Sequence, residues 1–145
     1  MTISRKALAT LSDQDYAALA DFRYVLRKFM AFSEAEAAQH GLTPQQHQAL
    51  LAIRAAPGDS ATVGYVAERL LLKPHSATGL VNRLEVTGLV ARKPAPQDRR
   101  CSTLSVSVKG RRCLDALSAT HREEIKRLRP VLSQLVDRFQ DEPSA

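Results

Sequence analysis

A tight break between two short amphipathic segments is the feature that most constrains the fold. Apolar residues recur at helical spacing in the first segment, at Val63, Val66, Ala67, Leu70 and Leu71. Lys73 and Pro74 end this segment, and Pro74 also suits the first position of a second helix over 74–86. Two short helices joined by such a turn are typical of a helix-turn-helix.

An alternating segment follows the second helix and predicts a β-hairpin. Gly88 ends the helix, and the segment "LVARK" then leads to a proline-rich tip. Beyond the tip, Leu104, Val106 and Val108 alternate with polar residues, which is the period of a strand with one buried face. The middle of the chain is therefore predicted to be a helix-turn-helix followed by a wing.

Helices are also predicted on both sides of this middle segment. Residues 13–39 carry a wide apolar stripe at helical spacing, and a helix of this length, ~40 Å, overhangs a small core and needs a partner surface. Thr43, Pro44 and Gln46 together indicate an N-cap, a first helical position and a capping box. Helical spacing resumes at 109, and Pro130 is expected to kink that helix or to start another.

Three shorter segments are predicted to be irregular. Gly41 ends the first helix, residues 57–62 form a loop, and the tail from 141 to 145 frays.

Composition and charge indicate a globular protein with a polyanion-binding centre. Residues 42–112 hold 11 lysines and arginines against 4 aspartates and glutamates, so their net charge is +7 and the remainder of the +6 chain carries −1. A basic middle between near-neutral helices favours a nucleic-acid partner, although a solubilising surface is the simpler alternative. No stretch approaches the ~18 apolar residues of a membrane span, and no signal peptide is apparent. Two cysteines suit a reducing, cytoplasmic location.

The second helix of the pair divides into a buried face and a polar face. The predicted buried residues are Ala77, Leu80, Val81 and Leu84. The polar face, which we expect to read DNA bases, consists of His75, Ser76, Thr78, Gly79, Asn82 and Arg83. Asn82 suits the adenine edge, and the alternative for the whole face is simple solvation. Gly79 costs about 1 kcal/mol relative to alanine in a helix, which either close approach to DNA or a tight helix crossing would explain.

The segment "LVNRLEVTGLVARKPAPQDRRCSTLSVSVKGRRCL" resembles the winged helix of the MarR family of bacterial transcription regulators. The resemblance is carried by "RLE..GLV" at 83–90, by "DRR" at 98–100 and by "VSVKG" at 106–110. The last departs conservatively from the family's Leu-Thr-x-x-Gly pattern at Val106 and Ser107. "GLTPQQHQALLAI" resembles the family's second helix, and the likeness extends over nearly the whole chain.

This resemblance implies a mainly α fold with a minor β part, in which the terminal helices of two chains interleave. The expected dimerisation region is 1–41 with 109–145, and the winged helix-turn-helix is 42–108. The partner implied is a roughly palindromic double-stranded operator, with one recognition helix per half-site in successive major grooves. Repression by steric blocking of a promoter is a simpler action than activation. No cofactor is expected.

The resemblance also places the wing in the minor groove. Arg100 takes the family's inserting position, and Asp98 is expected to hold Arg100 through a charge-assisted bond. Phosphate contacts are expected from Arg99, Lys73, Arg92 and Lys93. The alternative is an Asp-Arg turn that only orders the wing.

Small aromatic or phenolic effectors are the regulation that the family implies. Candidate pocket residues are Arg23, Tyr24, Arg27, His40 and His47, each of which also suits an ordinary surface or interface role. A thiol switch is the other route. Relatives that sense peroxide use a cysteine in the first helix, which this chain lacks, and Cys101 beside Arg100 or Cys113 would have to serve.

An enzyme and a metal site are both poorly supported by the motifs. The sequence has no Cys-x-x-Cys, no His-Glu-x-x-His and no phosphate-binding glycine loop. The stronger rival is a DNA-architectural protein that binds without regard to sequence, since a protein-interaction scaffold does not explain the arginines of the wing. The polar, lysine-free recognition face favours base reading.

Overall fold

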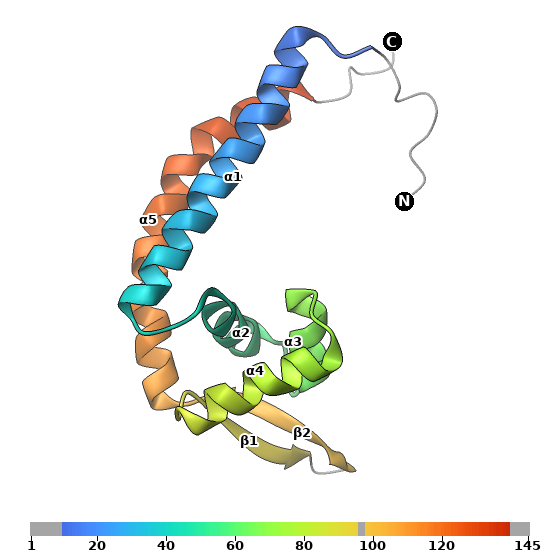
Figure 1. Cartoon of the computed structure of the whole chain (residues 1–145), viewed down its shortest axis with the longest axis vertical. Coiled ribbons are helices and arrows are strands. Elements are labelled where there is room, and N and C mark those ends of the chain that lie inside the picture. The colour runs from blue at the N-terminus through green and yellow to red at the C-terminus, as the bar shows by residue number, and fades with distance from the viewer. Residues whose placement is uncertain (1–9, 96–97, 140–145) are drawn as a thin grey trace. The chain divides into compact units, whose positions relative to one another are not determined.

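A computed structural model describes residues 10–95 and 98–139, except for the side chains at 95 and 98–101. The chain forms two compact units, and the division between them lies inside the two longest helices, α1 (Asp13–Gln39) and α5 (Val108–Arg138) (Figure 1). The helical extents agree with the prediction for 13–39 and, within one residue, with the helix expected from 109.

The first unit comprises residues 1–31 and 123–145, and the second comprises residues 32–122. The predicted functional regions, 1–41 with 109–145 for dimerisation and 42–108 for DNA binding, are a different division of the chain and stay a prediction. The end of α1 and the start of α5 belong to the second unit because Ala37, Leu114 and Leu117 are buried in its core.

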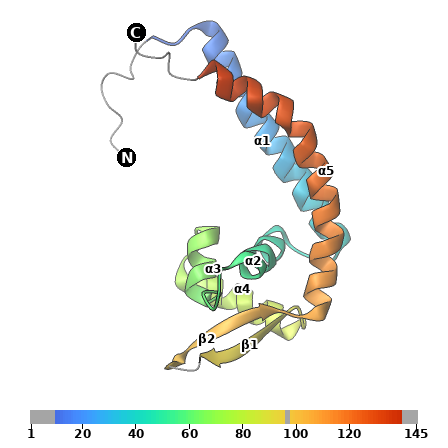
Figure 2. The same cartoon turned by 180° about the vertical axis from the view of Figure 1, so that it is seen from behind.

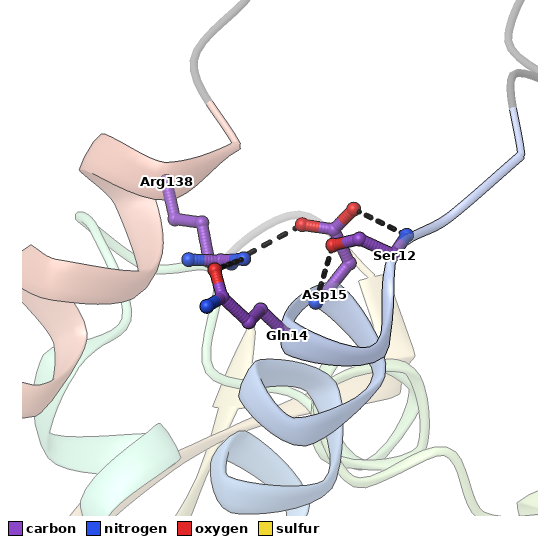
Figure 3. A network of polar contacts seen from close by, with 4 residues as sticks. All are labelled: Ser12, Gln14, Asp15 and Arg138. Atoms are coloured by element: carbon purple, nitrogen blue, oxygen red, sulfur yellow. Dashed lines mark hydrogen bonds and ion pairs between the residues drawn. The ribbon is translucent and has the colours of Figure 1, made fainter.

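In the first unit, α1 and α5 lie side by side (Figures 1 and 2). Their ends are joined by Arg138, whose Nε donates to Asp15 Oδ1 over 3.1 Å and whose Nη2 donates to Gln14 Oε1 over 3.3 Å (Figure 3). Hydrogen bonds from the backbone and hydroxyl of Ser12, together with Arg138, lower the pKa of Asp15. Reciprocal bonds between Ser12 and Asp15 begin α1 in the manner of a capping box.

Pro130 neither ends α5 nor begins another helix, so the expectation of a second helix is wrong. Proline has no N–H, so one helical hydrogen bond is missing at this position. Its ring nevertheless fixes φ near the helical value, and α5 continues on both sides of it.

The second unit is a winged helix made of α2 (Pro44–Ala55), α3 (Val63–Leu70), α4 (Pro74–Val86), β1 (Val90–Ala95) and β2 (Asp98–Val106). The capping box of α2 is present as predicted, with Thr43 Oγ1 accepting from the Gln46 N–H and Gln46 Oε1 accepting from the Thr43 N–H. A single core joins the three helices to the hairpin, and its fully buried large residues are Leu50, Val66, Val81, Leu84 and Leu117.

The turn between α3 and α4 corrects one apolar position. Leu71 adopts a left-handed conformation with φ of 54° and is 93% exposed, so its predicted place on the apolar face of α3 is wrong. The left-handed residue reverses the chain, and the Leu72 N–H donates to the Ala67 carbonyl over 2.8 Å. Leu72 thereby packs against the core in place of Leu71.

The wing is an antiparallel pair in which Val90 faces Val106 and Arg92 faces Leu104. Leu104 and Val106 are buried as predicted, whereas Val108 is exposed because it begins α5 rather than continuing the strand. Ser107 makes this change of structure. Its Oγ accepts from the Gly110 N–H and donates to the Gly88 carbonyl, while its own N–H donates to the Leu89 carbonyl.

Gly110 is required by the close approach of α5 to the start of the wing. A Cβ at this position would lie 2.4 Å from the Leu89 carbonyl oxygen and 2.7 Å from Val106 Cγ1. Backbone and a buried branched side chain cannot move away without disturbing the core.

We therefore expect Gly110→Ala to lower the free energy of unfolding by about 1–3 kcal/mol through overpacking. Gly64→Ala is the matched control, because a Cβ at Gly64 would meet only Thr62 Oγ1, at an ordinary 3.7 Å. Urea titrations at one protein concentration would measure both. Equal stability of the two variants would contradict this account of Gly110.

Candidate nucleic-acid interface

Helix α4 is buried along one face and polar along the other. The buried residues are Ala77, Leu80, Val81 and Leu84, as the sequence predicted. His75, Ser76, Thr78, Asn82 and Arg83 are exposed, and Gly79 is half-buried among them. The helix runs beside the hairpin of β1 and β2 in both views (Figures 1 and 2). The polar face of α4 and the wing therefore belong to one compact unit.

The surroundings of Gly79 exclude one of its two explanations. A Cβ on Gly79 would have only the side chain of Arg83 within 4 Å, at 3.8 Å. No neighbouring helix of the described chain crosses α4 closely at this position, so a tight helix crossing does not account for the glycine. Close approach to DNA, the other explanation, stays a prediction.

The N-terminal end of α4 presents a cation and an acceptor. Lys73 is the N-cap residue, and its exposed side chain makes no capping bond, while Pro74 occupies the first turn. The Thr78 hydroxyl donates to the Pro74 carbonyl over 3.0 Å. Because its one proton is used there, the hydroxyl of the exposed Thr78 is left to act only as an acceptor.

A three-residue bridge links β1 to α4. Arg92 Nε donates to Glu85 Oε2 over 2.8 Å, and Arg92 Nη2 donates to Asn82 Oδ1. The Arg92 side chain is 30% exposed and the Glu85 side chain 46% exposed. From the sequence, Arg92 was predicted to contact a phosphate and Asn82 a base, and Glu85 was overlooked. Glu85 follows Asn82 by three residues, so the two side chains lie on the same helix face, and this spacing could have indicated a shared partner.

Lys109 is a second residue that sequence reasoning overlooked. Its Nζ donates to the Thr87 carbonyl over 2.9 Å. This carbonyl lies at the C-terminal end of α4, where a cation is favourable to the helix dipole. Lys109 thus joins the start of α5 to the end of α4.

The tip of the wing lies largely outside the description. Asp98, Arg99 and Arg100 lie in β2, but their side chains, like that of Cys101, are outside the described part. Lys93 is exposed on β1, and its carbonyl accepts from the Thr103 hydroxyl over 3.4 Å. The roles expected of the wing arginines stay predictions.

Known proteins similar to this chain share its winged-helix fold. The model of the MarR family matches residues 40–100. MhqR of Bacillus subtilis, an HTH-type transcriptional regulator, is 32% identical over 96 residues, which are 66% of this chain and 65% of MhqR. The chain thus matches just under two thirds of that relative's length.

Solved structures show the same fold. AbsC, a MarR family transcriptional regulator from Streptomyces coelicolor, superposes with a TM-score of 0.71 at 19% identity, covering 91% of this chain and 93% of AbsC. MepR of Staphylococcus aureus in complex with DNA has a TM-score of 0.66 at 20% identity, covering 86% of this chain and 85% of MepR.

The winged helix of this chain belongs to the MarR family. No described helix is both long and apolar enough to cross a membrane. Among the described side chains, no three of histidine, cysteine, aspartate or glutamate gather in a way that would hold a metal ion. The Cys113 thiol is free and packs, half-buried, against the core.

The predicted pocket residues fall into the two units. Arg23, Tyr24 and Arg27 are exposed in the first unit, where Lys28 Nζ lies 5.4 Å from the centre of the Tyr24 ring. His40 and His47 belong to the second unit, and the exposed His40 places Nδ1 3.0 Å from the Glu36 carbonyl. Their role as an effector pocket stays a prediction.

His47 is part of a cluster of rings in the second unit. It is 6% exposed, and its ring centre lies 4.9 Å from that of His121. His121 Nδ1 donates to the Leu117 carbonyl over 2.7 Å, and its Nε2 lies 2.8 Å from Ser33 Oγ. Within the described chain His47 Nδ1 has no hydrogen-bond partner. Burial, followed by the charges of His121 and His40, lowers the pKa of His47.

A lowered pKa means that the folded state favours neutral His47. The free energy of unfolding is therefore undiminished by this group above pH 6.5, and it decreases as the pH falls below 6.5, because the unfolded chain then binds the proton more readily. We expect the free energy of unfolding of His47→Gln to depend less on pH between 7 and 5 than that of the natural chain, by up to about 1.4 kcal/mol per pH unit. Asp15 acts in a separate window, below its ordinary 3.8. Denaturant titrations across this range would measure the difference, and identical slopes would rule out His47 as the titrating group.

Proposed function

We propose that this chain is a homodimeric transcription regulator that binds double-stranded operator DNA. The observation that carries the proposal is the division of α4, whose apolar face is entirely used by the core while its polar face stays exposed. The net charge of +7 over residues 42–112 supports a polyanionic partner. MepR, which shares the fold, was crystallised with DNA, and this supports the same class of partner here.

In this function α4 enters the major groove. His75, Ser76, Thr78, Asn82 and Arg83 face the base edges, and Gly79 allows the helix backbone to approach them closely. Lys73 and Lys93, at the two margins of this face, contact phosphates and set the register. Two copies place two such helices on successive turns of a roughly palindromic site.

The wing takes the adjacent minor groove. Arg100 inserts where a narrow A·T-rich groove concentrates negative potential, and Asp98 orients it. Arg99 contacts the phosphate backbone. A wing that contributes order but no contact is the alternative for this part of the proposal.

Dimerisation is supported by the apolar surface of the first unit. No described residue of that unit is buried, and most of the exposed large apolar residues gather there. They are Leu11, Tyr16, Leu19, Tyr24, Leu26, Met30, Ile125, Leu132, Val136 and Phe139. A pair of helices with so much exposed apolar surface needs a partner, and a second copy of the same helices is the economical one.

Repression by steric blocking, in the bacterial cytoplasm and associated with the nucleoid, is the simplest action of such a dimer. A small aromatic or phenolic ligand bound near Arg23, Tyr24, Arg27, His40 or His47 releases the DNA by favouring the arrangement that does not fit it. If no member of a panel of phenolic carboxylates raises the thermal unfolding midpoint of the protein or releases it from the operator, the proposed effector regulation is contradicted. A thiol switch is the weaker route, because Cys113 is half-buried against the core.

The interface prediction concerns an exposed residue of α5. Val136 is 61% exposed and lines an apolar groove with Ile125 and Leu132. A symmetric dimer carries a substitution twice, so we expect Val136→Glu to raise the dimer dissociation constant on the order of 100-fold by burying carboxylates. Val108→Glu is the matched control, because Val108 is 67% exposed at the start of α5, within the second unit. Sedimentation at several concentrations would distinguish them, and an unaffected dimer would exclude this surface.

The DNA prediction compares the wing with the recognition helix. Arg100→Ala should weaken operator binding by about tenfold or more at physiological salt and leave the dimer folded. Gly79→Ala should weaken binding while raising the free energy of unfolding by about 0.5–1 kcal/mol, because alanine favours a helix. Gly64→Ala controls for added methyl groups away from the proposed groove-facing surface.

Footprinting on intergenic DNA would supply the operator for these measurements. A salt series on that operator and on random DNA separates the two classes of function. Equal affinity for both DNAs would favour the architectural alternative, and normal binding by Arg100→Ala would remove the wing from the mechanism.

A further inference from the structure

The bridge between Asn82, Glu85 and Arg92 bears on which base the recognition helix selects. Asn82 is exposed on the polar face of α4, and its Oδ1 accepts from Arg92 Nη2. A guanidinium only donates, so this contact fixes which atom of the amide is oxygen and which is nitrogen. The contact leaves the Nδ2 amino group of Asn82 as its free polar end.

Glu85 makes this orientation persistent. Its Oε2 accepts from Arg92 Nε over 2.8 Å, so one planar guanidinium is held by two residues of α4 at once. Arg92 itself lies on β1, opposite Leu104 of β2, whose side chain is buried. The guanidinium therefore approaches Asn82 from a strand that the core fixes in place.

The bridge changes the chemistry that Asn82 offers to DNA. An asparagine that reads adenine in two-point contact must donate to N7 and accept from the N6 amino group. A carbonyl oxygen has two lone pairs, but here a full positive charge lies beside it and opposes the approach of another N–H donor. Guanine presents two acceptors, N7 and O6, and both suit an amino group next to a cation.

We propose that Arg92 acts as a positioning residue which makes Asn82 select guanine rather than adenine. This inference rests on the proposed function, because it needs α4 in the major groove. It replaces the adenine contact that the residue type alone favours. It also gives Arg92 a role within the protein instead of a contact with a phosphate.

The test is selection of bound sites from a randomised double-stranded DNA library by the full chain, followed by affinities for single-base variants of the selected site. We expect one guanine in each half-site whose replacement by adenine weakens binding on the order of tenfold. Asn82→Ala should reduce this discrimination to about twofold or less, since no side-chain donor remains.

Two further variants separate positioning from folding. Arg92→Lys keeps the charge but loses the planar fork that reaches both partners, so discrimination between guanine and adenine should fall to about twofold. Asn82→Asp keeps a partner for Arg92, and thus the fold, but has no donor, so selection should move from guanine to cytosine, whose N4 amino group donates. Arg54→Lys, the same change on an exposed arginine of α2, is the control and should leave the selected sites unchanged.

Each outcome decides the proposal. A selected operator in which Asn82→Ala and Arg92→Lys alter no position, or in which the natural chain prefers adenine at the Asn82 position, overturns the role of the bridge and leaves the proposed function standing. A natural chain that selects no site at all overturns both. Thermal midpoints of all variants within a few degrees of the natural chain exclude misfolding as the cause.

Discussion

The burial of one face of α4 is the constraint on which the rest of the winged helix depends. Ala77, Leu80, Val81 and Leu84 are all buried, so the rotation of the helix about its axis is set by the core. The orientation of the polar face follows from that rotation. Any change that repacks the core would therefore also turn the side chains that we propose to meet DNA.

Hydrogen bonds just after the C-terminal end of α4 then fix the wing beside it. Ser107 bonds to the carbonyls of Gly88 and Leu89, and Lys109 bonds to the carbonyl of Thr87. These contacts join the end of the recognition helix, the return strand and the start of α5 in one small region. Gly110 allows these segments to approach so closely, since a Cβ at this position would collide with the Leu89 backbone. These hydrogen bonds thus hold the wing beside α4, so the two surfaces that we propose to meet DNA keep one arrangement.

The two units differ in how they are stabilised. The winged helix has its own core, whereas the described part of the first unit has exposed apolar residues along both helices and an ion pair between Arg138 and Asp15. Exposed ion pairs contribute little to stability. The buried His47 lies in the second unit, where ring contacts among Phe32, His47 and His121 connect α1, α2 and α5. A charge on His47 would therefore lie beside contacts that join three helices.

The sequence by itself determined the helices, the capping box of α2 and the buried face of α4, because these depend on local spacing, on Thr43, Pro44 and Gln46, and on apolar periodicity. It misplaced Leu71 and Val108, whose environments depend on a left-handed turn and on the cap that Ser107 provides. Only the tertiary structure brought Arg92 to Asn82 and His47 to His121, since these partners are distant in the chain. Residue type shows what a side chain is able to bond, but the fold decides which bond is already made.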